Sequence, residues 1–165
     1  MANTDFIKQL KLVSRKKYFV YNVKFICGLQ KNKFENDCEA AILSRGIYST
    51  EINILNYGFK DFRIAKAFIP VVIHNQAIAR EPKIKSAVSF EAVDLKRLSA
   101  TMDDCCKITE KLKEEKADEQ LKIGFVEIVS PEPIEVYAVY TVTDLEQMNP
   151  SVNVVQVEAK TLSFG

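Results

Sequence analysis

The sequence predicts an all-β protein: an antiparallel β-sandwich, immunoglobulin-like or jelly-roll-like, of seven to eight strands, with one short helix inserted before the last three. Two observations carry this prediction. Apolar and polar residues alternate over most of the chain from Tyr18 to Ala159, a two-residue period typical of half-buried strands. The connections between these runs are too short for crossover helices, which favours antiparallel pairing and two packed sheets.

The strand pattern falls into seven runs separated by turn residues. These runs are 18–27, 47–56, 62–73, 86–95, 122–130, 133–143 and 151–159. Pro70 cannot donate to a ladder, so we expect the third run to form an edge, a bend or a crossover between sheets. His74 to Gln76 predict a hairpin turn directly after it.

One segment has the pattern of a helix, residues 102–116. Thr101 followed by Asp104 fits an N-cap with an acid in the first turn. The outer face of this segment alternates positive and negative charge, so we expect a solvated helix that links two strands.

The length of 165 residues suits one buried core and is too short for two ordinary domains, so residues 18–165 are expected to form a single sandwich domain. Residues 1–17 differ, because they carry five basic side chains and one acidic one. The apolar residues of this segment fit one face of a helix: Phe6, Ile7, Leu10 and Val13. We expect a basic amphipathic arm, helical or extended, that is either a solvated leader or a segment docking on a neighbouring acidic surface.

The four cysteines, Cys27, Cys38, Cys105 and Cys106, match neither a CxxC pair nor a zinc-finger spacing. Three interpretations stay open: incidental thiols, a disulfide between Cys27 or Cys38 and the Cys105–Cys106 pair, or a metal site. Adjacent helical residues point about 100° apart, so Cys105 and Cys106 cannot both point squarely into one site. Cys105, Cys106 and His74 are only weak metal candidates, and we expect no metal and no cofactor.

The net charge and the absence of known motifs argue against several classes of function. A net charge of +1 gives no global reason to expect nucleic acid or an anionic membrane as partner. No phosphate-binding glycine motif is present, and His74, the single histidine, has no acid or nucleophile near it in sequence. We therefore expect no catalytic residues. Charged and polar residues near strands offer a polar interaction surface instead: Glu51, Arg80, Glu81, Asp103 and Asp104.

No apolar run approaches 18 residues, and lysines interrupt the N-terminal apolar runs. We expect no membrane span and no signal peptide. These features favour cytoplasmic synthesis, with incorporation into an intracellular or a spore or cell-surface assembly.

Several strings taken together resemble a bacterial family of small β-rich proteins. They are YSTEINILN at 48–56, AREP at 79–82, ATMDDCC at 100–106, GFVEIVS at 124–130 and VYAVYT at 136–141. The resemblance covers about residues 18–160, and Ala79 stands where the family pattern has glycine. It implies one compact all-β domain and marks Cys27, Arg80, Glu81 and Asp103 to Cys106 as family features, without giving them a role.

The absence of a catalytic motif, many strands and the N-terminal arm favour a non-catalytic structural or interaction subunit. We expect it to associate with itself, as a homo-oligomer or a filament. Two alternatives are a thiol or metal-binding protein that uses Cys27, Cys105 and Cys106, and a module that binds protein or carbohydrate.

Overall fold

The computed structural model describes residues 17–31, 43–114 and 119–163. The N-terminal arm, apart from Lys17, lies outside the described residues. Ten strands and one helix make up the described part: β1 (Lys17–Gln30), β2 (Gly46–Asn56), β3 (Phe62–Ile73), β4 (Gln76–Ala77), β5 (Ser89–Leu95), β6 (Ser99–Asp104), α2 (Cys105–Lys111), β7 (Lys122–Ser130), β8 (Glu135–Asp144), β9 (Pro150–Gln156) and β10 (Lys160–Ser163).

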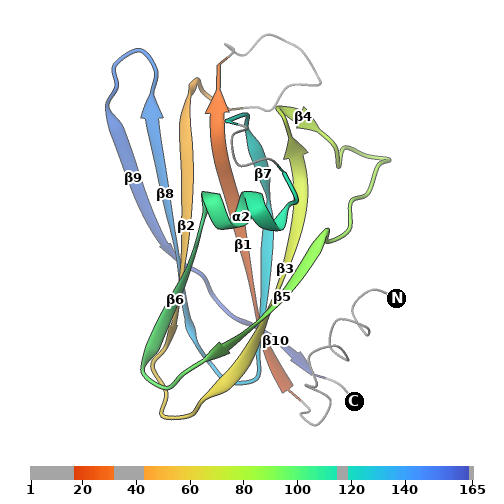
Figure 1. Cartoon of the computed structure of the whole chain (residues 1–165), viewed down its shortest axis with the longest axis vertical. Coiled ribbons are helices and arrows are strands. Elements are labelled where there is room, and N and C mark those ends of the chain that lie inside the picture. Colours follow the sequence, from red (N-terminus) through yellow and green to blue (C-terminus); the bar gives the residue numbers. More distant parts are fainter. Residues whose placement is uncertain (1–16, 32–42, 115–118, 164–165) are drawn as a thin grey trace.

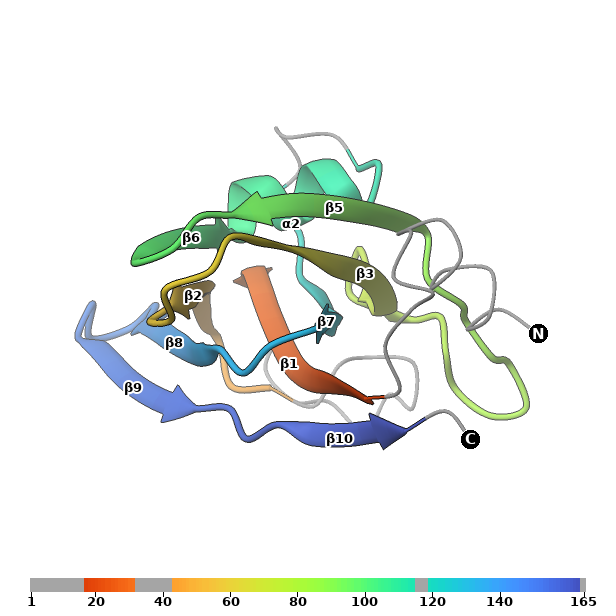
Figure 2. The same ribbon diagram turned by 90° about the horizontal axis from the view of Figure 1, so that it is seen from below.

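The ten strands form one antiparallel sheet, which confirms the all-β prediction. Its main path runs β4-β3-β7-β1-β2-β8-β9, while β5 also pairs with β3, β6 with β2 and β10 with β1. The sheet bends so that the half containing β3, β7 and β1 faces the half containing β2, β6 and β8, as the end-on view in Figure 2 shows. Helix α2 lies across β1 between these halves (Figure 1).

The core lies between the inner faces of the two halves. Its buried side chains come from both halves and from α2, because alternate residues of each strand point inward. The hydroxyl of Tyr21 joins the halves by a polar contact inside this core. It donates to the carbonyl of Ile134 at 2.8 Å and accepts from the backbone N–H of Ile134 at 3.0 Å. Burial raises the pKa of Tyr21, so this hydroxyl stays protonated and keeps both bonds.

Strand β2 changes partner along one edge. It pairs with β1 at Gly46–Tyr48 and with β6 from Glu51 to Asn56. Thr50 lies between these two stretches of β2. Its hydroxyl group donates to the carbonyl of Ile26 and accepts from the N–H of Ile26, both at 2.9 Å. A side chain thus replaces the missing backbone ladder between β1 and β2.

The irregularity expected at Pro70 is present, although β3 is a central strand. Pairing of β3 with β7 shifts register between Pro70 and Val72. On its other edge, β3 leaves β5 after Phe68 and meets β4 at Val72, so the missing N–H of Pro70 interrupts no ladder. Gly124 of β7 lies opposite, where a Cβ atom would clash with the Ile69 carbonyl and the Phe25 ring.

The helix prediction was wrong in its start and length. Residues 102–104 belong to β6, and α2 begins at Cys105 with Asp104, not Thr101, as its N-cap. The Asp104 carboxylate accepts from the N–H of Lys107 at 2.8 Å. The reason is tertiary: six residues of β6 pair with β2, and that pairing outweighs local helix propensity. Three short strands, β4, β6 and β10, were also not counted as such, and four strands follow the helix instead of three.

Candidate functional site

Cys27 in the last part of β1 and Cys105 at the start of α2 form a disulfide, with an S–S distance of 2.03 Å. The structure therefore has one of the three arrangements left open for these cysteines. Cys106 is free and exposed, and Cys38 lies outside the described residues. The N–H of Thr50 donates to the sulfur of Cys105 at 3.1 Å, so the disulfide lies where β1, β2 and α2 meet.

A pocket of about 160 Å³ opens beside this disulfide. Its lining includes all three described cysteines together with Gly28, Thr109, Glu119 and Lys122. Gly28 has a φ of 105°, and a Cβ atom there would meet the Gln120 carbonyl at 2.5 Å, so only glycine fits this wall. The pocket thus brings a free thiol and a disulfide to one opening.

His74 does not join the cysteines. It lies in the turn between β3 and β4, and its Nε2 is 3.0 Å from a carboxylate oxygen of Glu114. Among residues 17–31, 43–114 and 119–163, no group of three or more His, Cys, Asp or Glu side chains is placed to hold a metal ion.

A buried ion network links the two halves of the sheet beneath α2. The ammonium group of Lys66 in β3 donates to both carboxylate oxygens of Asp103 in β6, at 2.8 and 2.9 Å. The same nitrogen is 2.8 Å from a carboxylate oxygen of Glu91, its cross-strand neighbour in β5. Buried charges need partners of this kind, and here one lysine forms ion pairs with two acids.

Glu91 extends the network to the helix. Its other carboxylate oxygen is 3.0 Å from the ammonium group of Lys107 and 2.9 Å from that of Lys111. Burial works against the charged form, but the bonds from Lys66, Lys111 and Lys107 prevail and lower the pKa of Glu91 from 4.5 to about 2. The network therefore fixes α2 onto β5.

The predicted polar surface is not one surface. Glu51 and Asp104 are cross-strand partners on the outer face of the second half of the sheet. Asp103 was wrongly assigned to this surface, because successive strand residues alternate faces and its side chain points inward to Lys66. Arg80 and Glu81 lie apart, on the wall of an open pocket between β4 and β5.

Sequence reasoning missed an apolar strip on the outer face. In-register pairing aligns Glu51, Val139 and Val154 across β2, β8 and β9. Val152 and Met102 lie on the same face and are exposed. Strand β9 is an edge of the sheet and is exposed along its whole length. The run 151–159 has the pattern of a half-buried strand, but β9 lies at the sheet edge, and all seven of its residues are exposed.

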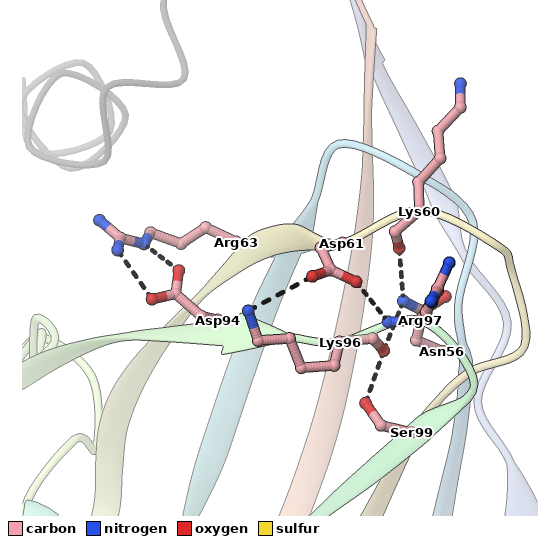
Figure 3. Close-up of polar contacts among 8 residues, drawn as sticks. All are labelled: Asn56, Lys60, Asp61, Arg63, Asp94, Lys96, Arg97 and Ser99. Carbon is pink, nitrogen blue, oxygen red and sulfur yellow. Dashed lines mark hydrogen bonds and ion pairs between the residues drawn. The ribbon is translucent and has the colours of Figure 1, made fainter.

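A second polar cluster fixes two turns at one end of the molecule (Figure 3). The buried amide of Asn56 donates to the carbonyls of Lys60 and Lys96 at 2.9 and 2.8 Å, and its oxygen accepts from the N–H of Gly58. Asp61 accepts from the N–H of Arg97 at 2.8 Å. These bonds tie the turn between β2 and β3 to the turn between β5 and β6.

No family model matches the chain, and no curated protein matches it. Among solved structures, it is similar to "Crystal Structure of Thermotoga maritima 1070" with a TM-score of 0.44 and 7% identity, over 88% of this chain and 96% of that one. A likeness this distant carries no argument about function. None of the helices among the described residues is both long and apolar enough to cross a bilayer.

Proposed function

We propose that this protein is a non-catalytic structural or interaction subunit that associates with copies of itself through β9 and the outer face beside it. The observation that carries the proposal is the exposure of Val152 and Val154, at 62% and 60%, on a strand at the edge of the sheet. Edge strands present unpaired backbone groups, and proteins normally protect them with charge, a bulge or a cover.

Strand β9 carries little of that protection. From Ser151 to Gln156 it has no charged residue, and Pro150 blocks only its first position. Among the described strands it pairs with β8 alone, so its second edge faces no described strand. A second copy offers the same strand, and antiparallel pairing of two β9 edges would extend the sheet and bring the two sets of valines together.

The symmetry of this contact determines the assembly. Pairing of β9 with β9 is two-fold and closes as a dimer, whereas pairing of β9 with a different edge of the next copy repeats as a filament. In both cases, burial of the apolar strip supplies the apolar part of the interface. The acids Glu51 and Asp104 lie on the same face of the sheet, where β2 pairs with β6.

Sedimentation velocity of the full chain tests this proposal. Val152→Lys with Val154→Lys puts two charges on the strip and is expected to weaken association at least about 100-fold, since like charges would meet across the contact. Ile84→Lys is the matched control, because Ile84 is 89% exposed on the loop before β5. A wild-type chain that stays monomeric at tens of micromolar, or an assembly unaffected by the double change, would refute the proposal.

A second candidate function rests on the pocket that holds the Cys27–Cys105 disulfide and the free Cys106. We propose thiol–disulfide exchange there. The Cys106 thiolate would attack the sulfur of Cys27, the bond to Cys105 would break, and Cys105 would leave as a thiolate and take up the proton that Cys106 lost. Peptide mapping under non-reducing conditions tests it: a mixture of Cys27–Cys105 and Cys27–Cys106 is expected, and a single pairing under all redox buffers would exclude it.

A further inference from the structure

One end of the molecule exposes three large apolar side chains on two adjoining turns. Phe59 is 81% exposed, Tyr57 50% and Leu98 64%. The N–H of Leu98 donates to the carbonyl of Gly58 at 3.2 Å, which places Leu98 beside the other two. We call Tyr57, Phe59 and Leu98 the apolar tip. Both turns lie at the lower end in Figure 1, where β2 turns into β3 and β5 into β6.

The backbone beneath the apolar tip is fixed in place. Asn56 is fully buried and holds both turns through its amide, while Asp61 anchors the N–H of Arg97 (Figure 3). The exposed side chains therefore project from a rigid base, so a partner that receives them pays little for ordering the turns.

Leu98 has a φ of 49°, a left-handed conformation that glycine or asparagine adopts more easily than a leucine does. A large apolar side chain that is exposed to solvent in such a backbone conformation does not stabilise the fold. Strained positions of this kind are concentrated at sites of binding and function.

Three cations lie on the same two turns as the apolar tip. Lys60, Lys96 and Arg97 are set against one acid, Asp61, whose carboxylate is 3.3 Å from the Lys96 ammonium group. The side chains of Lys60 and Arg97 form no ion pair within the described part of the chain, and Figure 3 shows Lys60 extending away from the cluster. The tip is thus apolar at its point and carries an excess of positive charge at its base.

We propose that the apolar tip inserts into the surface of a bilayer containing anionic phospholipid, with Lys60 and Arg97 against the headgroups. Apolar side chains that enter the acyl boundary, backed by lysine and arginine at headgroup level, are the chemistry that such a surface selects. A protein partner is less suited, because a stable protein interface needs about 800 Å² per partner and this end offers three projecting side chains. The inference is independent of self-association through β9.

The chain contains no tryptophan, so Phe59→Trp introduces a single reporter at the tip. Its emission is expected to shift to the blue with vesicles of phosphatidylcholine and phosphatidylglycerol, and much less with phosphatidylcholine alone. Ile84→Trp is the matched control, since Ile84 is 89% exposed on a loop that also carries lysines. That reporter is expected to stay unshifted.

Vesicle sedimentation measures the strength of binding. Phe59→Ser is expected to lower the partition coefficient about tenfold, which corresponds to loss of one inserted aromatic side chain. Lys60→Gln with Arg97→Gln is expected to lower it about 25-fold, at roughly fivefold for each charge near the surface. Lys83→Gln with Lys113→Gln removes two exposed charges on other loops and is expected to change it little.

Far-UV circular dichroism establishes that each variant is folded. Three outcomes would overturn the proposal: no partition of the folded wild-type chain into the anionic vesicles, an equal blue shift of the Ile84→Trp reporter, or an equal loss from the two distant lysine changes. Monomeric and assembled chains both carry the apolar tip, so a failure here leaves the β9 proposal unaffected.

Discussion

Lys66 and Asp103 lie in opposite halves of the bent sheet, and their side chains, each 2% exposed, meet at 2.8 Å in the protein interior. Lys66 points inward from β3, and Asp103 points inward from β6. This ion pair and the Cys27–Cys105 disulfide are two links that bind α2 and its neighbouring strands to the body of the sheet.

Lys66→Met is expected to lower the free energy of unfolding by about 3–5 kcal/mol, because it leaves the buried Asp103 carboxylate without its partner. Urea denaturation at neutral pH measures this loss. Lys107→Met is the control: its side chain is 35% exposed, and its loss is expected to stay below about 1 kcal/mol. The double variant with Asp103→Leu should recover most of the stability, and equal losses from both single variants would contradict this account.

Glu91 makes stability depend on pH. Its pKa falls from 4.5 to about 2 on folding, so its contribution is fully present above about pH 4.5 and is lost as the pH falls towards 2. The shift corresponds to at most about 3 kcal/mol. Thermal unfolding of wild type and Glu91→Gln from pH 7 to 2 measures it, with the difference between the two curves expected to shrink below pH 4.5. Other carboxyl groups with lowered pKa values, such as Asp94 and Asp144, affect both curves alike.

Reduction of the Cys27–Cys105 disulfide is expected to lower the free energy of unfolding by about 2–4 kcal/mol, since it releases a loop of 78 residues in the unfolded chain. Unfolding by urea with and without reductant measures the effect. The Cys27→Ser variant should show no response to reductant, and Cys106→Ser should respond like wild type. A response that persists in Cys27→Ser would place the effect at another cysteine.

Figure 3 shows a buried amide, that of Asn56, and an exposed ion pair, Arg63 with Asp94, in the same region of the molecule. Their contributions to stability are expected to differ. Asn56→Ala is expected to cost about 2–3 kcal/mol, because it leaves the buried groups that bind this amide unpaired. Arg63→Ala breaks only the exposed pair with Asp94, at 2.7 Å, and should cost less than about 1 kcal/mol. Urea denaturation compares them, and the reverse order of losses would contradict the role given to Asn56.

The long strands were predictable because their signal is local. From Phe19 to Cys27 and from Tyr48 to Ile54 the sequence alternates at a period of two, and both runs are strands. The segment Ser99–Asp104 lacks such a run, and the capping residues near it suggested a helix. Its strand conformation comes from pairing with β2, a partner more than 40 residues away, which no local pattern encodes.

The sites were less predictable than the strands. Four cysteines allow several pairings, and only the packing of β1 against α2 selects Cys27 with Cys105. Lys66 lies between alanines in a strand and has no motif around it. Its role depends on facing Asp103 across the core, a relationship set by the bend of the sheet. Asp103 and Asp104 are adjacent and identical in residue type, so the sequence does not distinguish them. Because successive strand residues alternate faces, Asp103 points into the core and Asp104 points to the outer face of the sheet.

The first described strand pairs with the last. Lys17 lies opposite Ser163 and Val20 opposite Lys160, so contacts between the most distant parts of the described chain form one short ladder. Circular permutation would exploit this: a short linker from 163 to 17, with new ends opened in the loop at 78–88, turns the most remote pairing into a hairpin. In exchange, the pairing of β3 with β5, which is local in the native order, becomes remote, so the overall contact order changes little and both the folding rate and the equilibrium stability should stay close to native.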